Sequence, residues 1–366
     1  MVEQPRLEAP GGVVISRYEE TDRAALIEFR RHHYGAGAPQ ADPAYVDWQF
    51  RDAPGVRERG APLWIARKDG SLVGTIARIR TSVRIGEEEV PAAWAVDFAV
   101  RADLRKSGIG EALAVVSRRE PAVRLVMESA TATQGITART GYRLVCDVPL
   151  FVRPLQPARW LQTHRVPRAL ALLSSPLLPL LAALDDRALR NAHKAGIELV
   201  ETRSFDDRAD RLVADLSPHY PVICRRDRAW LEWRFERHPL AHRYRLHWLV
   251  AHGRTVGYAV LRAGAYRGAP AGVLVDYLCA PELIGPLLAR CIERFREARA
   301  AVISCLHLNP AGARAFWGAG FLRRRSGWPF LAQPDGASAR ATRLLVDPDS
   351  WFATAGDSNV DRDRPA

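Results

Sequence analysis

The sequence has little that would direct the chain into a membrane or hold a metal ion. Its five cysteines are odd in number, scattered and without C-x-x-C spacing, which argues against a disulfide framework and a zinc cluster. The first residues carry acidic side chains and prolines, where a signal peptide has a cationic start and an apolar core. The longest leucine-rich run, LALLSSPLLPLLAAL, is too short and too interrupted by proline to span a bilayer. We therefore expect a cytoplasmic protein with no integral membrane span and no metal.

Lysine is almost absent, although the net charge of the 366 residues is +12. The positive charge comes from arginines that are spread along the chain, and no nucleic-acid reader motif accompanies them. We therefore expect an anionic small molecule rather than a nucleic acid as the partner of the basic residues. The length and the 48% hydrophobic content allow two or three domains with ordinary cores.

One stretch combines a strand signal, a glycine turn and a helix signal. The apolar run from Trp94 to Val100 predicts a buried strand, and Glu111 to Arg118 predicts a helix. Glycines let a backbone approach an anion closely, and the first N–H groups of a helix have no internal partner. The turn therefore suits a phosphate group. Its residues are Arg105, Lys106, Ser107, Gly108, Ile109 and Gly110.

The order of elements around this turn completes a domain. A helix from Thr21 to Arg31, an antiparallel meander from Pro62 to Ile85, and a strand at Val123 to Met127 are predicted from caps and apolar alternation. A last strand follows Gly141. The first 150 residues are therefore predicted to form an α/β domain of the α+β type, with a mixed sheet.

R-x-x-G-x-G after a strand ending in D-x-A-V resembles the acyl-CoA loop of the GNAT superfamily of N-acyltransferases. The resemblance implies acetyl-CoA as co-substrate, with its pyrophosphate on the RKSGIG turn. It also implies that two central strands splay apart and that the pantetheine arm lies along an open edge formed by Phe98, Ala99 and Val100. In this pattern a backbone N–H of Ala99 or Val100 stabilises the oxyanion of the transition state.

The second half of the chain repeats the first. Asp227 to Phe235 matches Asp42 to Phe50 at a constant shift, so that Trp233 stands where Trp48 stands. Further pairs follow in order, which predicts two copies of one fold. They are Val73-Gly74 with Val256-Gly257, Val96-Asp97-Phe98 with Val275-Asp276-Tyr277, and Gly141-Tyr142 with Gly320-Phe321. We interpret the two repeated tryptophans as core anchors.

The predicted architecture is two tandem GNAT-like domains, each a mixed, largely antiparallel sheet with flanking helices. The predicted boundaries are 1–150 for the first domain and 197–352 for the second. Residues 151–196 are rich in proline and leucine and predict a helical linker, with a membrane-surface segment near Arg165 and Arg168 as the alternative. Residues 353–366 are predicted to be a disordered tail.

The two copies differ at the turn. After Asp276-Tyr277 the second copy reads LCAPELIGPLLARC, which has neither the arginine nor the paired glycines. The second copy keeps the end pattern N-x-x-A-x-x-x-F-x-x-x-G-F, with Phe316 where the family often has a tyrosine that protonates the CoA thiolate. We therefore expect one CoA site for each chain.

Acyl transfer to an amine also needs a base near the open edge. Two carboxylates on the strands that should line the gap are candidates, Glu128 and Asp97. Asp97 has a counterpart in Asp276, which favours a role in the fold, so Glu128 ranks first. The expected function is transfer of an acetyl or other acyl group to an amine of a small metabolite, amino sugar or cell-wall precursor. The alternative is a non-catalytic module that binds CoA as a sensor or scaffold.

Overall fold

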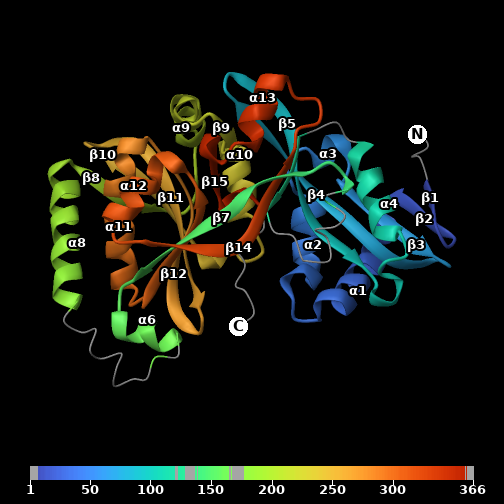
Figure 1. Ribbon diagram of the computed structural model, residues 1–366, viewed down its shortest axis with the longest axis horizontal. Coiled ribbons are helices and arrows are strands. Elements are labelled where there is room, and N and C mark those ends of the chain that lie inside the picture. Colours follow the sequence, from blue (N-terminus) through green and yellow to red (C-terminus); the bar gives the residue numbers. More distant parts are fainter. Residues whose placement is uncertain are drawn as a thin grey trace. The chain divides into compact units, whose positions relative to one another are not determined.

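The computed structural model describes residues 7–119, 123–127, 137, 139–164, 166, 177–358 and 360. The fold is mixed α/β, and the chain divides into two compact units that interleave along the sequence (Figure 1). The N-terminal unit comprises Met1–Cys146, Trp233–Pro239 and Pro329–Val346. The C-terminal unit comprises Asp147–Glu232, Leu240–Trp328 and Asp347–Ala366.

The sheet of the N-terminal unit is an antiparallel meander to which one parallel strand is added. Its order is β1-β2-β3-β4-β5-β6, and only the β5–β6 pair is parallel. The strands are β1 Leu7–Ala9, β2 Val13–Arg17, β3 Leu63–Lys68, β4 Ser71–Ile85, β5 Glu88–Val100 and β6 Val123–Met127. The helices are α1 Arg23–Tyr34, α2 Pro43–Phe50, α3 Val56–Arg59, α4 Ile109–Val116 and α13 Ala339–Val346.

The C-terminal unit repeats this plan with the order β8-β10-β11-β12-β13. Again one central pair, β12–β13, is parallel. Its strands are β8 Ile197–Thr202, β9 Val222–Cys224, β10 Tyr244–Ala251, β11 Arg254–Tyr266, β12 Ala269–Cys279, β13 Val302–Leu308 and β15 Trp351–Thr354. Its helices are α6 Pro157–Thr163, α8 Leu177–Lys194, α9 Arg208–Leu216, α10 Arg228–Leu231, α11 Ile284–Glu297 and α12 Pro310–Gly318.

Equivalent residues perform equivalent tasks in the two copies, which confirms the predicted tandem fold. Asp42 caps α2 by accepting a hydrogen bond from Ala44 N, and Asp227 caps α10 through Trp230 N. A Cβ on Gly74 would lie 3.3 Å from the carbonyl oxygen of Ala99, and one on Gly257 would lie 2.5 Å from that of Leu278. The neighbouring strand therefore leaves no room for a side chain at Gly257, and at Gly74 its neighbours would have to shift by a few tenths of an ångström.

The last strand of each copy ends in the sheet of the other unit. β7, Arg143–Pro154, pairs through Leu150–Pro154 with β13. β14, Leu322–Gln333, pairs through Phe330–Gln333 with β6. The units are interleaved for this reason, and they differ from the contiguous domains 1–150 and 197–352 that the sequence predicts.

The repeated tryptophans meet inside the N-terminal unit. The rings of Trp48 and Trp233 stack with centroids 4.6 Å apart and planes 6° apart. Each indole N–H donates to the backbone oxygen of the other tryptophan, at 2.8 and 2.9 Å. Both side chains are buried, so the two residues anchor the core in a reciprocal pair.

The segment between the copies is partly helical where it is described. The first residues of this segment, up to Pro154, belong to β7, and α6 and α8 follow. α8 packs against α11. Buried Asp185 of α8 receives ion pairs from Arg153 and Arg296. Arg165 and Arg168, on which the membrane-surface alternative rests, lie outside the described residues. None of the described helices is long and apolar enough to cross a membrane.

Residues 353–358, which begin the predicted disordered tail, are part of the folded structure, whereas residues 359 and 361–366 lie outside the described residues. Ala353 and Thr354 belong to β15, and Ala355 to Asp357 form a 3₁₀ turn. These residues and Ser358 are buried. Composition indicated a polar, solvated segment, but Thr354 and Asp357 bond to Asp276 and Arg226, which lie far away in the sequence.

Candidate functional site

The glycine turn lies between the end of β5 and the start of α4. A 3₁₀ turn over Ala102–Leu104 leads into it, and the hydroxyl of Ser107 donates to the carbonyl oxygen of Leu104 at 2.7 Å. Gly108 is the N-cap of α4 with φ = +89°, in the left-handed region that favours glycine. Lys106 also has a positive φ, +68°. The turn is therefore sharp, and it directs the start of α4 toward the end of the strand.

Several groups that can bind an anion converge at this turn. The first intrahelical bond of α4 runs from Ala112 N to Gly108 O, so the N–H groups of residues 109–111 have no intrahelical partner. The Arg105 and Lys106 side chains are exposed, and among the described residues neither makes an ion pair. Free cations, free N–H groups and the positive end of a helix dipole together fit a phosphate group.

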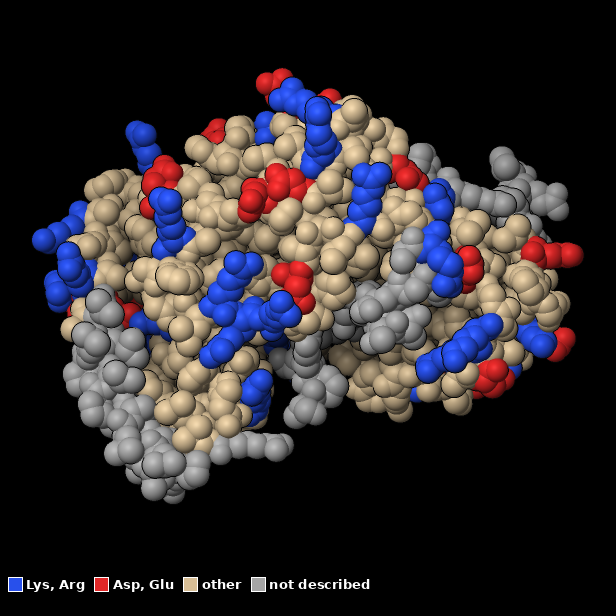
Figure 2. Space-filling view, in the orientation of Figure 1, with Lys and Arg blue, Asp and Glu red and all other residues tan. Residues whose placement is uncertain are grey.

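The positive charge of the protein is not confined to this turn. Figure 2 shows Lys and Arg side chains across the whole visible face, with Asp and Glu side chains among them. The turn differs from this background because its two exposed cations lie beside a helix N-terminus. The neighbouring arginine, Arg101, is instead held by Asp103 in an ion pair of 2.7 Å.

The two central strands of the N-terminal unit separate beside the turn. β5 pairs with β6 only from Ala92 to Trp94, and the register ends at Trp94↔Leu125. Beyond it, no described strand pairs with Val96–Val100 on the side away from β4. We call this stretch the N-terminal opening.

The direction of the free backbone groups follows from the β4–β5 register. Arg101 N donates to Val73 O at 2.8 Å, and Val100 stands opposite Gly74. Because N–H groups alternate between the two edges of a strand, the N–H and C=O of Val100 face away from β4. Of the two candidate oxyanion donors, Val100 therefore points to the N-terminal opening and Ala99 points to β4. The side chains of Phe98 and Val100 pack on the core beneath α4.

Asp97 occupies a bulge within the stretch that forms the N-terminal opening. Its φ is +49°, and the β4–β5 register shifts at this point. The buried guanidinium of Arg30 on α1 pairs with the Asp97 carboxylate at 3.0 Å, and it also donates to Gln40 O at 3.1 Å. The carboxylate is thus held against a helix, and the ion pair fixes the bulge in β5.

The remaining predicted site residues lie at the start of α4 or outside the described part of the chain, and a histidine that was not predicted lies near the turn. Ile109 is buried and Gly110 is half-buried at the start of α4. Glu128 lies outside the described residues. The sequence did not single out His33 of α1, whose pKa is lowered by burial and by the nearby charge of Arg105. A neutral imidazole therefore stands close to the turn, and only the three-dimensional fold brings it there.

The residues that follow β12, all of which the structure describes, form no equivalent turn. After β12 the chain enters a short 3₁₀ turn at Pro281–Leu283 and then α11, with acidic Glu282 in the first turn. The retained end pattern of this copy has structural roles. Asn309 caps α12 by accepting from Gly312 N, and fully buried Phe316 stacks on His307 with centroids 4.1 Å apart.

Comparison with solved structures agrees with this geometry. A GCN5-related N-acetyltransferase from Anabaena variabilis has a TM-score of 0.56 at 10% identity, covering 87% of this chain and 72% of the other. The N-myristoyltransferase of Saccharomyces cerevisiae with bound myristoyl-CoA has a TM-score of 0.55 at 12% identity, covering 90% and 83%. A GCN5-related N-acetyltransferase from Kribbella flavida has a TM-score of 0.54 at 13% identity, covering 88% and 71%.

The chain has a tandem GNAT fold. No protein-family model and no curated protein matches the sequence, so the likeness is one of structure. Among the described residues, no group of His, Cys, Asp and Glu is arranged to hold a metal ion. The N-terminal copy of the fold carries the turn and the open strand edge together.

Proposed function

We propose that the chain is an N-acyltransferase that binds one acyl-CoA in its N-terminal unit and transfers the acyl group to an amine. The main support is that three features adjoin the C-terminal end of β5. They are the exposed cations Arg105 and Lys106, the left-handed Gly108 and the open strand edge. An anionic ligand with an extended, amide-containing arm fits such a site. Its phosphates would contact Arg105, Lys106 and the start of α4, and its arm would pair with the free edge of β5.

The chemistry needs little beyond positioning and charge stabilisation. An amine nitrogen attacks the thioester carbonyl, and the C–N bond forms as the carbonyl oxygen becomes negative. The N–H of Val100, which faces the opening, is the proposed donor to this oxyanion. The C–S bond then breaks, the amine loses a proton and the CoA thiolate gains one.

Glu128 remains the first candidate for the base, and Asp97 is the second. The ion pair with Arg30 favours the positioning role for Asp97, because its charge is already neutralised inside the fold. We assign the acceptor only to a class, namely an amine on a small metabolite, amino sugar or cell-wall precursor.

An assay of thiol release tests this proposal. The protein is incubated with acetyl-CoA and longer acyl-CoAs, each with a panel of amines, and free CoA is followed with a thiol reagent. Release that depends on one class of amine supports the proposal. A rise in melting temperature with CoA but no release with any amine would favour a CoA-binding sensor or scaffold instead.

A further inference from the structure

The chain continues after the last element that the two copies share. β14 is the counterpart of β7, and α13, β15 and the 3₁₀ turn Ala355–Asp357 follow it. Of these, α13 belongs to the N-terminal unit and β15 to the C-terminal unit. Every residue from Trp351 to Ser358 is buried. This stretch, which we call the C-terminal strap, is therefore an addition to the repeated fold.

The strap lies in an opening of the C-terminal unit that corresponds to the N-terminal opening. β12 and β13 pair only from Ala271↔Val302 to Val273↔Ser304. Further along, β13 pairs with the strap through His307↔Thr354 and Leu308↔Ala353. Thr354 also reaches Asp276 on β12, so the strap stands between the two strands that have parted.

The other edge of the strap is paired as well. Trp351 stands opposite Val222 and Phe352 opposite Ile223 in a short parallel pair with β9. The ring of Phe352 packs against Tyr220 at 4.4 Å and Tyr277 at 5.3 Å between centroids. The strap therefore has both backbone partners and an aromatic pocket.

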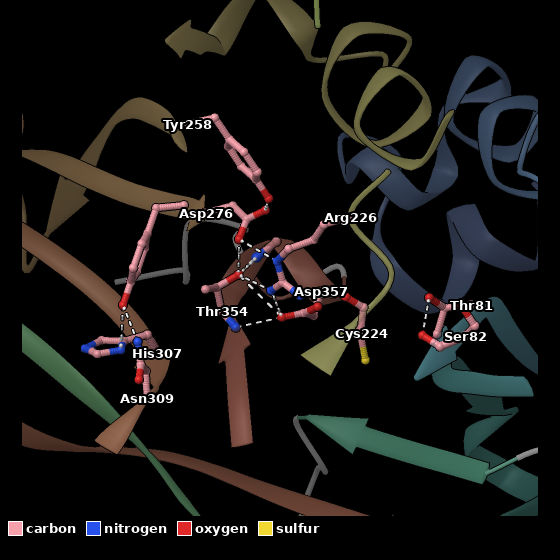
Figure 3. A network of polar contacts seen from close by, with 12 residues as sticks. Thr81, Ser82, Cys224, Arg226, Tyr258, Asp276, His307, Asn309, Thr354 and Asp357 are labelled. Atoms are coloured by element: carbon pink, nitrogen blue, oxygen red, sulfur yellow. Dashed lines mark hydrogen bonds and ion pairs between the residues drawn. The ribbon is translucent and has the colours of Figure 1, made fainter. Parts of the chain in front are cut away.

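Two side chains of the strap, Thr354 and Asp357, make buried polar contacts with residues of the C-terminal unit (Figure 3). The Thr354 hydroxyl donates to Asp276 Oδ1 at 2.6 Å. Asp357 Oδ2 accepts from Thr354 N at 2.7 Å and from the Arg226 guanidinium at 2.5 Å. Arg226 also pairs with Asp276 at 3.4 Å, and Tyr258 donates to the same carboxylate at 2.8 Å. The side chains of Arg226, Asp276 and Asp357 are at most 2% exposed.

We propose that the opening between β12 and β13 is a peptide-binding site and that its ligand is the chain's own C-terminal strap. Main-chain pairing supplies affinity, and the contacts of Phe352, Thr354 and Asp357 supply specificity, as in recognition by strand addition. The class of ligand is thus an extended peptide with an aromatic residue, a hydroxyl two residues later and a carboxylate three residues after that. This proposal concerns the unit without the glycine turn and does not depend on acyl transfer.

A binding experiment in trans tests the proposal. A chain that ends at Ser350 is compared with a control chain that ends at Val360, which keeps the strap. A fluorescent peptide with the sequence of Asp347–Val360 is titrated into each, and anisotropy is measured. We expect saturable binding to the chain ending at Ser350 and none to the control, in which the site is already filled.

Variant peptides then test the specificity. Replacing Thr354 by Ala or Asp357 by Asn in the peptide should weaken binding at least about fivefold. The first change removes a buried hydrogen bond to the Asp276 carboxylate, and the second removes the negative charge that pairs with Arg226. If the chain ending at Ser350 folds but does not bind the peptide, the proposal is wrong. Binding that is indifferent to both substitutions would overturn it too.

Hydrogen exchange on the full chain keeps the proposal testable if the shortened chain does not fold. Thr354→Val is compared with the control Thr342→Val in α13. We expect faster exchange at the amides of residues 307–308 and 351–357 in the first variant only. Equal exchange in the two variants would contradict the proposal.

Discussion

The two strand openings of this chain show how one fold can be completed in two ways. In the N-terminal unit the glycine turn adjoins the opening, and no described strand covers the free edge of β5. In the C-terminal unit the turn is replaced by Pro281–Leu283, and β15 covers the edge of β13. Parted strands leave backbone groups without partners, and such groups must find them. A ligand is proposed to complete one opening, and the chain's own end completes the other.

A buried arginine holds the central aspartate of each copy, but the two arginines come from different places. Arg30 lies on α1, whereas Arg226 lies just before α10. Arg30 compensates one carboxylate, and Arg226 compensates both Asp276 and Asp357. Removal of either cation leaves buried negative charge, which typically costs about 3–5 kcal/mol.

The largest expected effect follows from this difference. Arg226→Met should lower the free energy of unfolding by about 3–5 kcal/mol, and Arg30→Met should lower it by less, because it leaves one carboxylate unpaired instead of two. Urea denaturation followed by tryptophan fluorescence measures both. A loss below about 1 kcal/mol for Arg226→Met would show that the network is not a compensated buried ion cluster.

The cations of the turn give the next prediction. Arg105→Ala should weaken CoA binding by about 1–3 kcal/mol through loss of a charge-assisted contact with phosphate. Arg101→Ala removes the same charge from a side chain that is already paired with Asp103, so its effect should be smaller. Calorimetric titration with CoA measures both affinities. Equal effects of the two variants would indicate a general charge effect instead of a contact.

Replacing one glycine at the start of each helix, Gly108 at α4 and Gly285 at α11, tests whether the first turn needs a special backbone conformation. Gly108→Ala should destabilise the chain by about 1–2 kcal/mol, because its φ of +89° is unfavourable for a side chain. Gly285→Ala, in the first turn of α11, should be neutral or stabilising by up to about 1 kcal/mol, since a Cβ there meets nothing within 4 Å. Thermal unfolding of both variants checks this. Similar destabilisation by both would mean that the glycine of the first turn has no special conformation.

The smallest expected effect concerns pH. Burial raises the pKa of Asp357, and Asp276 raises it further, while Arg226 lowers it. A carboxyl group whose pKa is raised in the folded state stabilises the fold below its unfolded pKa of about 3.9 and loses this contribution as the pH rises through the folded value. Asp357→Asn should therefore reduce the loss of stability with rising pH over that window. Asp349→Asn, at an exposed position, is the control.

Urea midpoints measured at several pH values provide the test. The expected change in slope is at most about 1.4 kcal/mol for each pH unit, the limit for one proton. A steeper loss of stability with rising pH in Asp357→Asn than in the parent chain would contradict the direction of the shift.

The sequence predicts those features whose signal is local. The RKSGIG turn is visible because it needs particular residue types at fixed spacing. The repeat was visible for the same reason, and the structure gives Gly74 and Gly257 the same steric role.

Features that depend on distant partners were not predictable. The exchange of β7 and β14, and the covering of β13 by the strap, are decided by which free strand edges come together in space. Arg30 lies 67 residues from Asp97, and its position is not equivalent to that of Arg226, so alignment of the copies could not identify it. Residues 353–358 of the strap were predicted to be disordered for the same reason, because the partners of Thr354 and Asp357, Asp276 and Arg226, lie far away in the sequence.

The most direct test of the account is the number of CoA molecules that bind to one chain. Calorimetric titration of the full chain with CoA should give a single site for each chain, and Arg105→Ala should weaken that site. Thr354→Val, which changes only the C-terminal unit, should leave both the affinity and the number of sites unchanged. Two sites, or one site that responds to Thr354→Val and not to Arg105→Ala, would contradict the account.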